Sequence, residues 1–187
     1  AASDVYKRQV CKEVGNDLTS IYDKITSNTA KISKFLTDNG ISADEILVQP
    51  PQILDLQAER YGSNDRPFRY NVTSVVVVTS PNVEKVNKLI SRQTELLKQG
   101  IAITAGDYEY RTIYEYTALN DIKPGMIAEA TANAREAADK FAADSKSRLG
   151  KIKTASQGQF DISDRDPYTP YLKKVRVVST IVFYLED

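Results

Sequence analysis

The chain alternates between segments whose apolar residues recur every three or four positions and segments rich in consecutive β-branched residues. The first helical pattern lies between Asp17 and Gly40, where the apolar positions fall on one face of a predicted helix. These positions are Leu18, Ile21, Tyr22, Ile25, Ile32, Phe35 and Leu36. Asn16 or Asp17 can cap the start of this helix, and Asn39-Gly40 provides the left-handed conformation that ends it.

The segment after this helix is predicted to be short and extended. Ser42 to Glu45 has the spacing of a capping box, but Pro50-Pro51 follows so closely that only one helical turn fits. Ile46 to Leu56 is then expected to form an edge strand, because proline lacks the N–H that a central strand donates. Tyr61 to Pro67 is rich in Gly, Ser, Asn and Asp and is predicted to be a polar loop.

A buried strand and a second helix follow. Phe68 to Thr79 contains four consecutive valines and is apolar on both faces, which predicts a central strand. Ser80-Pro81 has the composition of a helix start, and apolar spacing carries the second predicted helix to Gln99-Gly100. Ile101 to Thr117 is predicted to return as a strand, interrupted near Gly106-Asp107.

The third and longest helix is predicted from Pro124 to Leu149-Gly150 and has a stripe of small residues. Such side chains allow a helix axis to lie close to a sheet. The stripe comprises Ile127, Ala130, Ala134, Ala137, Ala138, Phe141 and Leu149. Lys151 to Ile162 and Lys173 to Leu185 are predicted as the last two strands, joined by the loop Ser163 to Leu172.

This order of elements predicts an α+β fold, with three long helices packed on a mixed or antiparallel β-sheet in repeated helix-plus-hairpin units. The 187 residues suffice for one domain or two very small ones and need neither disulfide nor metal for a core. No apolar run approaches the roughly 18 residues of a membrane span.

Composition excludes several classes of function. The 25 Lys and Arg residues balance 25 Asp and Glu residues, which argues against a nucleic-acid partner bound through a strong positive field. The absence of histidine excludes Ser-His-Asp and Cys-His nucleophiles and His-ligated metals. Cys11 is the single cysteine and cannot close an intramolecular disulfide. No Gly-rich phosphate loop occurs, so neither a cofactor nor a metal ion is expected.

Two sets of carboxylates are candidates for calcium binding or acid–base catalysis. Asp161, Asp164 and Asp166 crowd one loop, but an EF-hand counted from Asp161 would need Gly and Glu where Asp166 and Leu172 stand. A solvated acidic turn is the simpler interpretation. Acid–base catalysis would need a facing pair of carboxylates. The candidates for such a pair are Glu59, Glu109, Glu115 and Asp121.

The tyrosines are the most informative polar-aromatic feature. Tyr108, Tyr110, Tyr114 and Tyr116 share one parity, so a continuous strand would place them on one face. Three interpretations stay open: a helix covers this face within the monomer, a second subunit covers it, or it forms a groove for a small molecule or peptide. With the aromatic and proline residues of the 163–172 loop, the predicted interface comprises Tyr108, Tyr110, Tyr114, Tyr116, Pro167, Tyr168, Pro170 and Tyr171.

Several short motifs together carry a family resemblance. In chain order they are Tyr114-Glu115-Tyr116-Thr117, Leu119-Asn120, Lys123-Pro124, Asn133 to Ala138, Leu149-Gly150-Lys151-Ile152 and Lys173 to Val178. From about Glu13 to its end the chain resembles the SIMPL domain family, also called DUF541. Family members usually begin with a signal peptide or membrane anchor and a first strand of the form V-x-G-x-G/A. Here Ser3 to Gln9 stands in that place, so residues 1–9 are interpreted as a doubtful or non-native segment and residues 10–187 as the SIMPL domain.

The resemblance implies a bacterial periplasmic or other extracytoplasmic protein without established catalytic residues. It further implies a homo-oligomer, membrane association through an N-terminal anchor absent from this chain, and a link to envelope or oxidative stress. We therefore expect a non-enzymatic envelope protein that acts through oligomeric assembly or binding. The alternative is a small-molecule or peptide-binding module that uses the Tyr108–Tyr116 strand face, and an enzyme ranks third.

Overall fold

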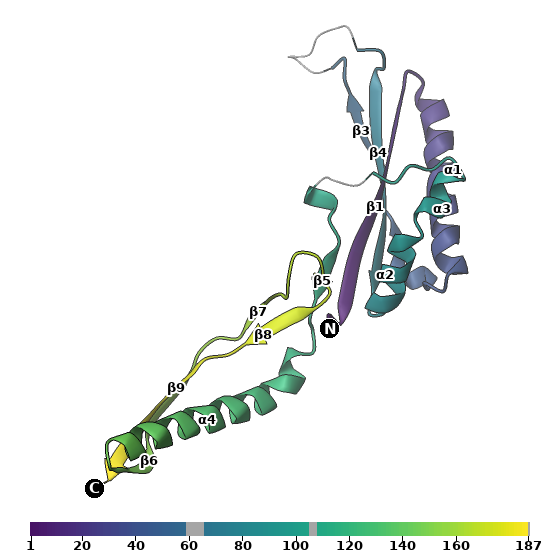
Figure 1. The fold of residues 1–187 in the computed structure, drawn as a ribbon. Helices are drawn as coiled ribbons and strands as arrows, with labels where there is room; N and C mark the ends of the chain where they lie inside the picture. Colours follow the sequence, from purple (N-terminus) through teal and green to yellow (C-terminus); the bar gives the residue numbers. More distant parts are fainter. Residues whose placement is uncertain (59–65, 105–107, 187) are drawn as a thin grey trace. The chain divides into compact units, whose positions relative to one another are not determined.

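The structure is a computed structural model that describes residues 1–58, 66–104 and 108–186 (Figure 1). The chain divides into two compact units, Ser3–Glu115 and a second unit formed by Tyr116–Asp187 together with Ala1–Ala2. All pairs between the strands described are antiparallel, so the predicted α+β class with antiparallel sheets is confirmed. Most of the predicted loop Tyr61–Pro67 and the predicted break near Gly106-Asp107 lie outside the described residues.

The Ser3–Glu115 unit is built on one sheet. Its strands are β1 (Asp4–Gly15), β2 (Ile46–Val48), β3 (Gln52–Asp55), β4 (Tyr70–Ser80) and β5 (Ile113–Glu115). One edge of β4 pairs with β1 and the other with β2 and β3 in succession, while β5 pairs with the free edge of β1. The valine run of β4 is buried on both faces, which confirms the prediction of a central strand.

The N-terminal segment corrects the expectation that a first strand is missing. Residues 4–9, which the sequence left without a strand, form the first half of β1, and Val5 pairs with Ser80 on one side and Tyr114 on the other. Val5, Gln9 and Cys11 are all buried. Pairing with two distant strands overrides the low local strand propensity of this charged segment.

Helices cover one face of this sheet (Figure 1). α1 (Leu18–Asp38) follows the predicted boundaries, since the Asp17 side chain accepts a hydrogen bond from the Ser20 N–H at 2.8 Å and Gly40 adopts φ +85°. The turn η1 (Ala43–Glu45) has the predicted capping box. Ile21, Ile25 and Val72 form a buried cluster between α1 and β4. Each such side chain contributes about 1.5–3 kcal/mol by leaving water.

The second predicted helix is shorter and broken. α2 (Val83–Ser91) begins after Asn82, whose side chain accepts from the Lys85 N–H at 3.0 Å, and α3 (Thr94–Leu97) follows as a separate turn. The helix start assigned to Ser80-Pro81 is wrong because Ser80 still pairs in β4.

The region predicted as a strand from Ile101 to Thr117 is mostly not a strand. Among the described residues of this range, Thr104 forms an isolated bridge to Val10, Tyr108–Tyr110 is a 3₁₀ turn (η2), and regular pairing is confined to β5. The four tyrosines therefore do not share one continuous pleated face.

The Tyr116–Asp187 unit consists of one helix and two antiparallel strand pairs. Its elements are α4 (Leu119–Asp144), β6 (Arg148–Gln157), β7 (Asp161–Asp164), β8 (Lys173–Arg176) and β9 (Ser179–Glu186). β6 pairs with β9 and β7 with β8, and α4 runs along the β6–β9 pair (Figure 1). α4 begins five residues before Pro124. It ends before Leu149-Gly150 because Lys146 adopts the left-handed φ of 58° that stops a helix.

The predicted alanine stripe is only partly covered. Within the stripe Ala134 and Ala138 are partly buried, whereas Ala137 is exposed and Phe141 is 75% exposed. The buried residue of the helix is Ala142, which the predicted stripe did not include. Leu149 lies in β6 rather than in the helix. The strand pair is narrow and covers little of the α4 surface, so the expectation of a tightly covered stripe is wrong at these positions.

Candidate functional site

An apolar groove lies between α1 and the edge formed by β2 and β3. Its floor consists of the buried residues Ile21, Ile25 and Val72, and its volume is about 320 Å³. The exposed rim consists of Leu18, Tyr22, Val48 and Ile53. The remaining lining residues are Thr26, Thr29, Gln49 and Pro51.

The groove carries no charged lining residue. The Thr29 hydroxyl donates a hydrogen bond within α1 to the carbonyl of Ile25 at 2.9 Å. The backbone N–H of Gln49 donates to the carbonyl of Val75 at 2.9 Å. The Pro50-Pro51 pair separates β2 from β3 and places Pro51 at the groove. Such a surface suits a neutral, largely apolar guest and lacks the groups that bind ions or phosphates.

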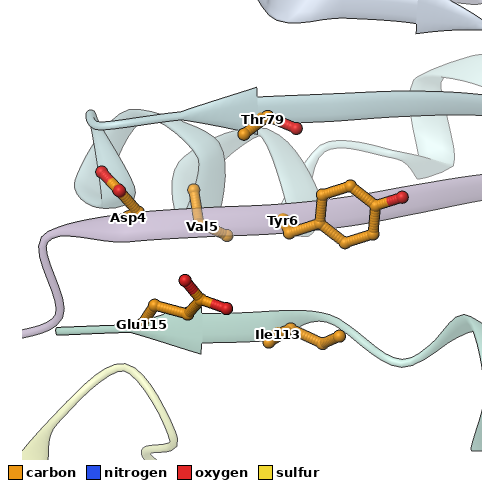
Figure 2. Close-up of a pocket in the computed structure, with 6 residues that line it drawn as sticks. All are labelled: Asp4, Val5, Tyr6, Thr79, Ile113 and Glu115. Carbon is orange, nitrogen blue, oxygen red and sulfur yellow. The ribbon is translucent and has the colours of Figure 1, made fainter. Parts of the chain in front are cut away.

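A second hollow of about 320 Å³ lies where β1, β4 and β5 run side by side (Figure 2). Asp4 and Glu115 lie opposite each other in register, and Tyr6 lies opposite Ile113. Thr79 of β4 and Val5 complete the lining. Two like charges directly opposite on neighbouring strands repel each other, so this pair costs stability rather than adding to it.

Three of the four carboxylates considered for acid–base chemistry lie on separate elements. Glu115 lines the hollow of Figure 2, Glu109 lies in η2, and Asp121 lies in the first turn of α4. Glu59 lies outside the described residues. In the described part of the chain, no three residues of the types His, Cys, Asp and Glu gather into a possible metal site.

The tyrosines of the predicted interface have separate environments. Tyr110 packs on the buried cluster of Val10, Val75 and Val77, and the Tyr114 hydroxyl donates to Asn87 Oδ1 of α2 at 2.5 Å. Tyr116 is partly buried, and Tyr108 lies in η2. Tyr110 and Tyr114 are thus engaged within the Ser3–Glu115 unit.

The other half of the predicted interface, the β7–β8 loop, is open. Tyr168 has 93% of its surface exposed, and Pro167 is also exposed, whereas Pro170 is partly buried. Tyr171 is partly buried, and its carbonyl accepts the Ala2 N–H at 2.7 Å. The interface residues are therefore not brought together into one surface within either unit.

The aspartates in and beside this loop have structural partners. Asp164 forms an ion pair with Lys173, and Asp166 forms one with Arg165 at 2.9 Å. Hydrogen bonds from the Thr169 side chain and from Arg165 lower the pKa of Asp166 to about 2. Asp161 and Asp164 lie in β7 and only Asp166 lies in the loop, so the three aspartates do not share the predicted turn.

One face of the β6–β9 pair carries exposed apolar side chains. Phe183 points toward α4, where the Arg135 guanidinium lies 5.4 Å from its ring centre. Val182 and Tyr184 alternate with Phe183 and therefore point to the opposite side. Their exposed fractions are 44% and 53%. This surface, Val182 and Tyr184 on β9, is called the β9 outer face below.

A polar stripe on β1 was missed by sequence reasoning. Lys7, Gln9 and Cys11 occupy every second position of β1 and therefore lie on one face of it. Gln9 Oε1 has no hydrogen-bond partner in the described structure. Burial lowers the pKa of Lys7. It also raises the pKa of Cys11 to about 11, with a further contribution from the charge of Glu13. The alternation of these residues was the available signal, but it becomes meaningful only once a strand is assigned there.

Taken together, the fold and the surfaces define a class: an α+β protein of antiparallel sheets and helices with apolar hollows and faces open to solvent. Among its described helices, none is both long enough and apolar enough to cross a membrane. The family model of SIMPL, a protein of unknown function (DUF541), matches residues 8–180, and the chain belongs to this family. No curated protein matches the chain.

Proposed function

We propose that this SIMPL-family chain is a non-enzymatic protein of the bacterial cell envelope that acts through homo-oligomeric assembly or binding and contributes to envelope or oxidative stress responses. The periplasmic or extracytoplasmic location and the stress role rest on the family resemblance. Assembly rests on the surface itself.

The β9 outer face is the observation that carries the proposal. In the described part of the Tyr116–Asp187 unit, the buried hydrophobic side chains are Ala2 and Ala142. With so few fully buried apolar side chains, this unit gains little stability from its own core. Val182 and Tyr184 offer further apolar area, which a second copy of the chain would remove from water.

Light scattering tests assembly directly. The wild type should have a mass several times the 20.9 kDa of the chain. Val182→Lys and Tyr184→Lys should each lower that mass, because a buried lysine without a partner is costly. Asn133→Lys adds the same charge at an exposed position of α4 and should not. A monomeric wild type, or equal effects of all three variants, would contradict the proposal.

The small-molecule or peptide module on the Tyr108–Tyr116 face has weaker support. Its premise was one continuous strand, and this segment contains η2 and the short β5 instead. Tyr110 packs against the core and the Tyr114 hydroxyl contacts α2. The non-enzymatic assignment is supported by the absence of histidine from the sequence.

A further inference from the structure

The β7–β8 loop holds Tyr168 outward in a defined conformation. Asp166 Oδ1 accepts the N–H groups of Tyr168 at 2.9 Å and Thr169 at 2.8 Å, and the Leu172 carbonyl accepts the Arg165 N–H at 2.8 Å. Arg165 Nη2 also donates to Thr169 Oγ1 at 3.0 Å. These hydrogen bonds order the backbone that carries the exposed Tyr168 ring, so docking of the loop costs less backbone conformational entropy.

The apolar groove of the Ser3–Glu115 unit has the complementary properties. Its floor is buried and apolar, and the Thr26 and Gln49 side chains give it a few polar groups. A volume of about 320 Å³ is at the small end of ligand pockets and suits one large side chain with its neighbours.

The loop and the groove are compatible in charge as well as in size. All eleven residues that line the groove are uncharged. The loop tip from Pro167 to Pro170 is also uncharged, and the flanking Arg165 and Asp166 neutralise each other at 2.9 Å. Neither surface would bury an unpaired charge when the two meet, which avoids the desolvation cost of such a charge.

We propose that the Tyr168 loop of one copy of the chain inserts into the α1–β2–β3 groove of a second copy. This inference rests on the proposed assembly and names one of its contacts. Loop and groove are different surfaces, so each copy can both give a loop and receive one, either reciprocally in a two-fold dimer or head to tail around a ring.

Disulfide trapping between two differently tagged single variants tests the contact. Tyr168→Cys mixed with Thr26→Cys should give a disulfide-linked heterodimer, because Thr26 lines the groove. Ser27→Cys is the matched control, being exposed and adjacent but absent from the lining. Docking raises the local thiol concentration, so the yield should exceed that of the Ser27 control by at least about tenfold. Cys11 is buried and should not compete.

Assembly measured by dilution gives the second readout. Tyr168→Ala should raise the dissociation constant by about thirtyfold, as expected for an aromatic hot spot. Tyr168→Phe, which keeps the ring, should stay near the wild type. Thr26→Glu, which places a charge in the groove, should weaken assembly more than Ser27→Glu does.

The outcomes separate the two proposals. If the wild type assembles and Val182→Lys disrupts it, but no Tyr168–Thr26 disulfide forms, the loop contact is wrong and the assembly proposal stands. If native mass spectrometry finds a small molecule in the groove and Tyr168→Ala has no effect, the occupant is that molecule and the loop contact is overturned. A monomeric wild type overturns both proposals.

Discussion

At the scale of single residues, Asp166 organises the β7–β8 loop. One carboxylate oxygen accepts two backbone N–H groups, and the other accepts the Thr169 hydroxyl and Arg165 Nε. These donors favour the ionised form, which is why the pKa of Asp166 falls to about 2 from an ordinary 3.8. Ionised Asp166 therefore orders the backbone at Tyr168, whose side chain is exposed.

The first prediction is that the loop loses its order only in strong acid. A carboxyl whose folded pKa is depressed stabilises the folded loop above its unfolded pKa, and this contribution disappears as the pH falls from about 4 to about 2. The amide resonances of Tyr168 and Thr169, followed by NMR, should shift with a midpoint near pH 2. Asp166→Asn should abolish the transition. A wild-type midpoint near pH 4 would show that the hydrogen bonds do not hold the carboxylate.

At the scale of elements, the short helix α3 packs against the rest of its unit through one buried side chain. Leu96 is fully buried at 0% exposure, whereas the next residue, Leu97, is 58% exposed. The Leu96 carbonyl also accepts the Ile101 N–H at 3.0 Å, so the turn that follows depends on the same residue. The two leucines form a natural matched pair.

The second prediction uses this pair. Leu96→Ala should lower the free energy of unfolding by about 2–5 kcal/mol, because it removes buried methyl groups and leaves a cavity. Leu97→Ala should change the free energy of unfolding by no more than about 0.5 kcal/mol. Urea unfolding followed by circular dichroism measures both. Similar losses would mean that α3 buries its other face.

The third prediction concerns α4. Ala142→Leu should destabilise the Tyr116–Asp187 unit by about 1–3 kcal/mol, since added methylenes at a buried position force side chains or backbone apart. Ala137→Leu, at an exposed position of the same helix, should be nearly neutral. Thermal unfolding of both variants checks the contrast, and equal melting temperatures would show that α4 is not packed through Ala142.

Local patterns explain which elements the sequence predicts correctly. α1 has apolar periodicity and both caps, and β4 has its valine run, so each is specified by neighbouring residues. β1 is different, because its charged residues become a strand only through pairing with β4 and β5. The prediction that the four tyrosines share one face is wrong because Tyr108–Tyr110 forms the 3₁₀ turn η2. Every second residue points to the same side only in a regular strand.

The candidate surfaces were even less accessible to sequence reasoning. Leu18 and Tyr22 on α1 meet Pro51 and Ile53 only through the fold, so no spacing rule predicts the groove. The exposure of Tyr168 was consistent with its place in a proline-bearing loop. Asp4 and Glu115 lie opposite each other in the hollow of Figure 2. Predicting this would require the strand register, which the sequence alone does not provide.

At the scale of the whole molecule, the fourth prediction links stability to concentration. A partner that binds the folded β9 outer face stabilises the chain by mass action, and a hundredfold rise in concentration above the dissociation constant is worth about 2.7 kcal/mol. For a chain of this length, that corresponds to a rise of about 5–10 °C in melting temperature. Calorimetry over such a range should detect it, and Val182→Lys should remove it. A constant melting temperature would count against assembly.

The position of β1 has a consequence for how the chain folds during synthesis. Val5 needs Ser80 on one side and Tyr114 on the other, so β1 emerges before either of the strands that enclose it. At about 5–20 residues per second, the ribosome takes about five to twenty seconds to supply both partners. Until Tyr114 emerges, at least one edge of β1 is unpaired, and the closure of that edge must wait for contacts far apart in sequence, which are slow to form. The nascent chain therefore completes its central sheet late, and until then residues 4–15 are open to any factor that binds a bare strand.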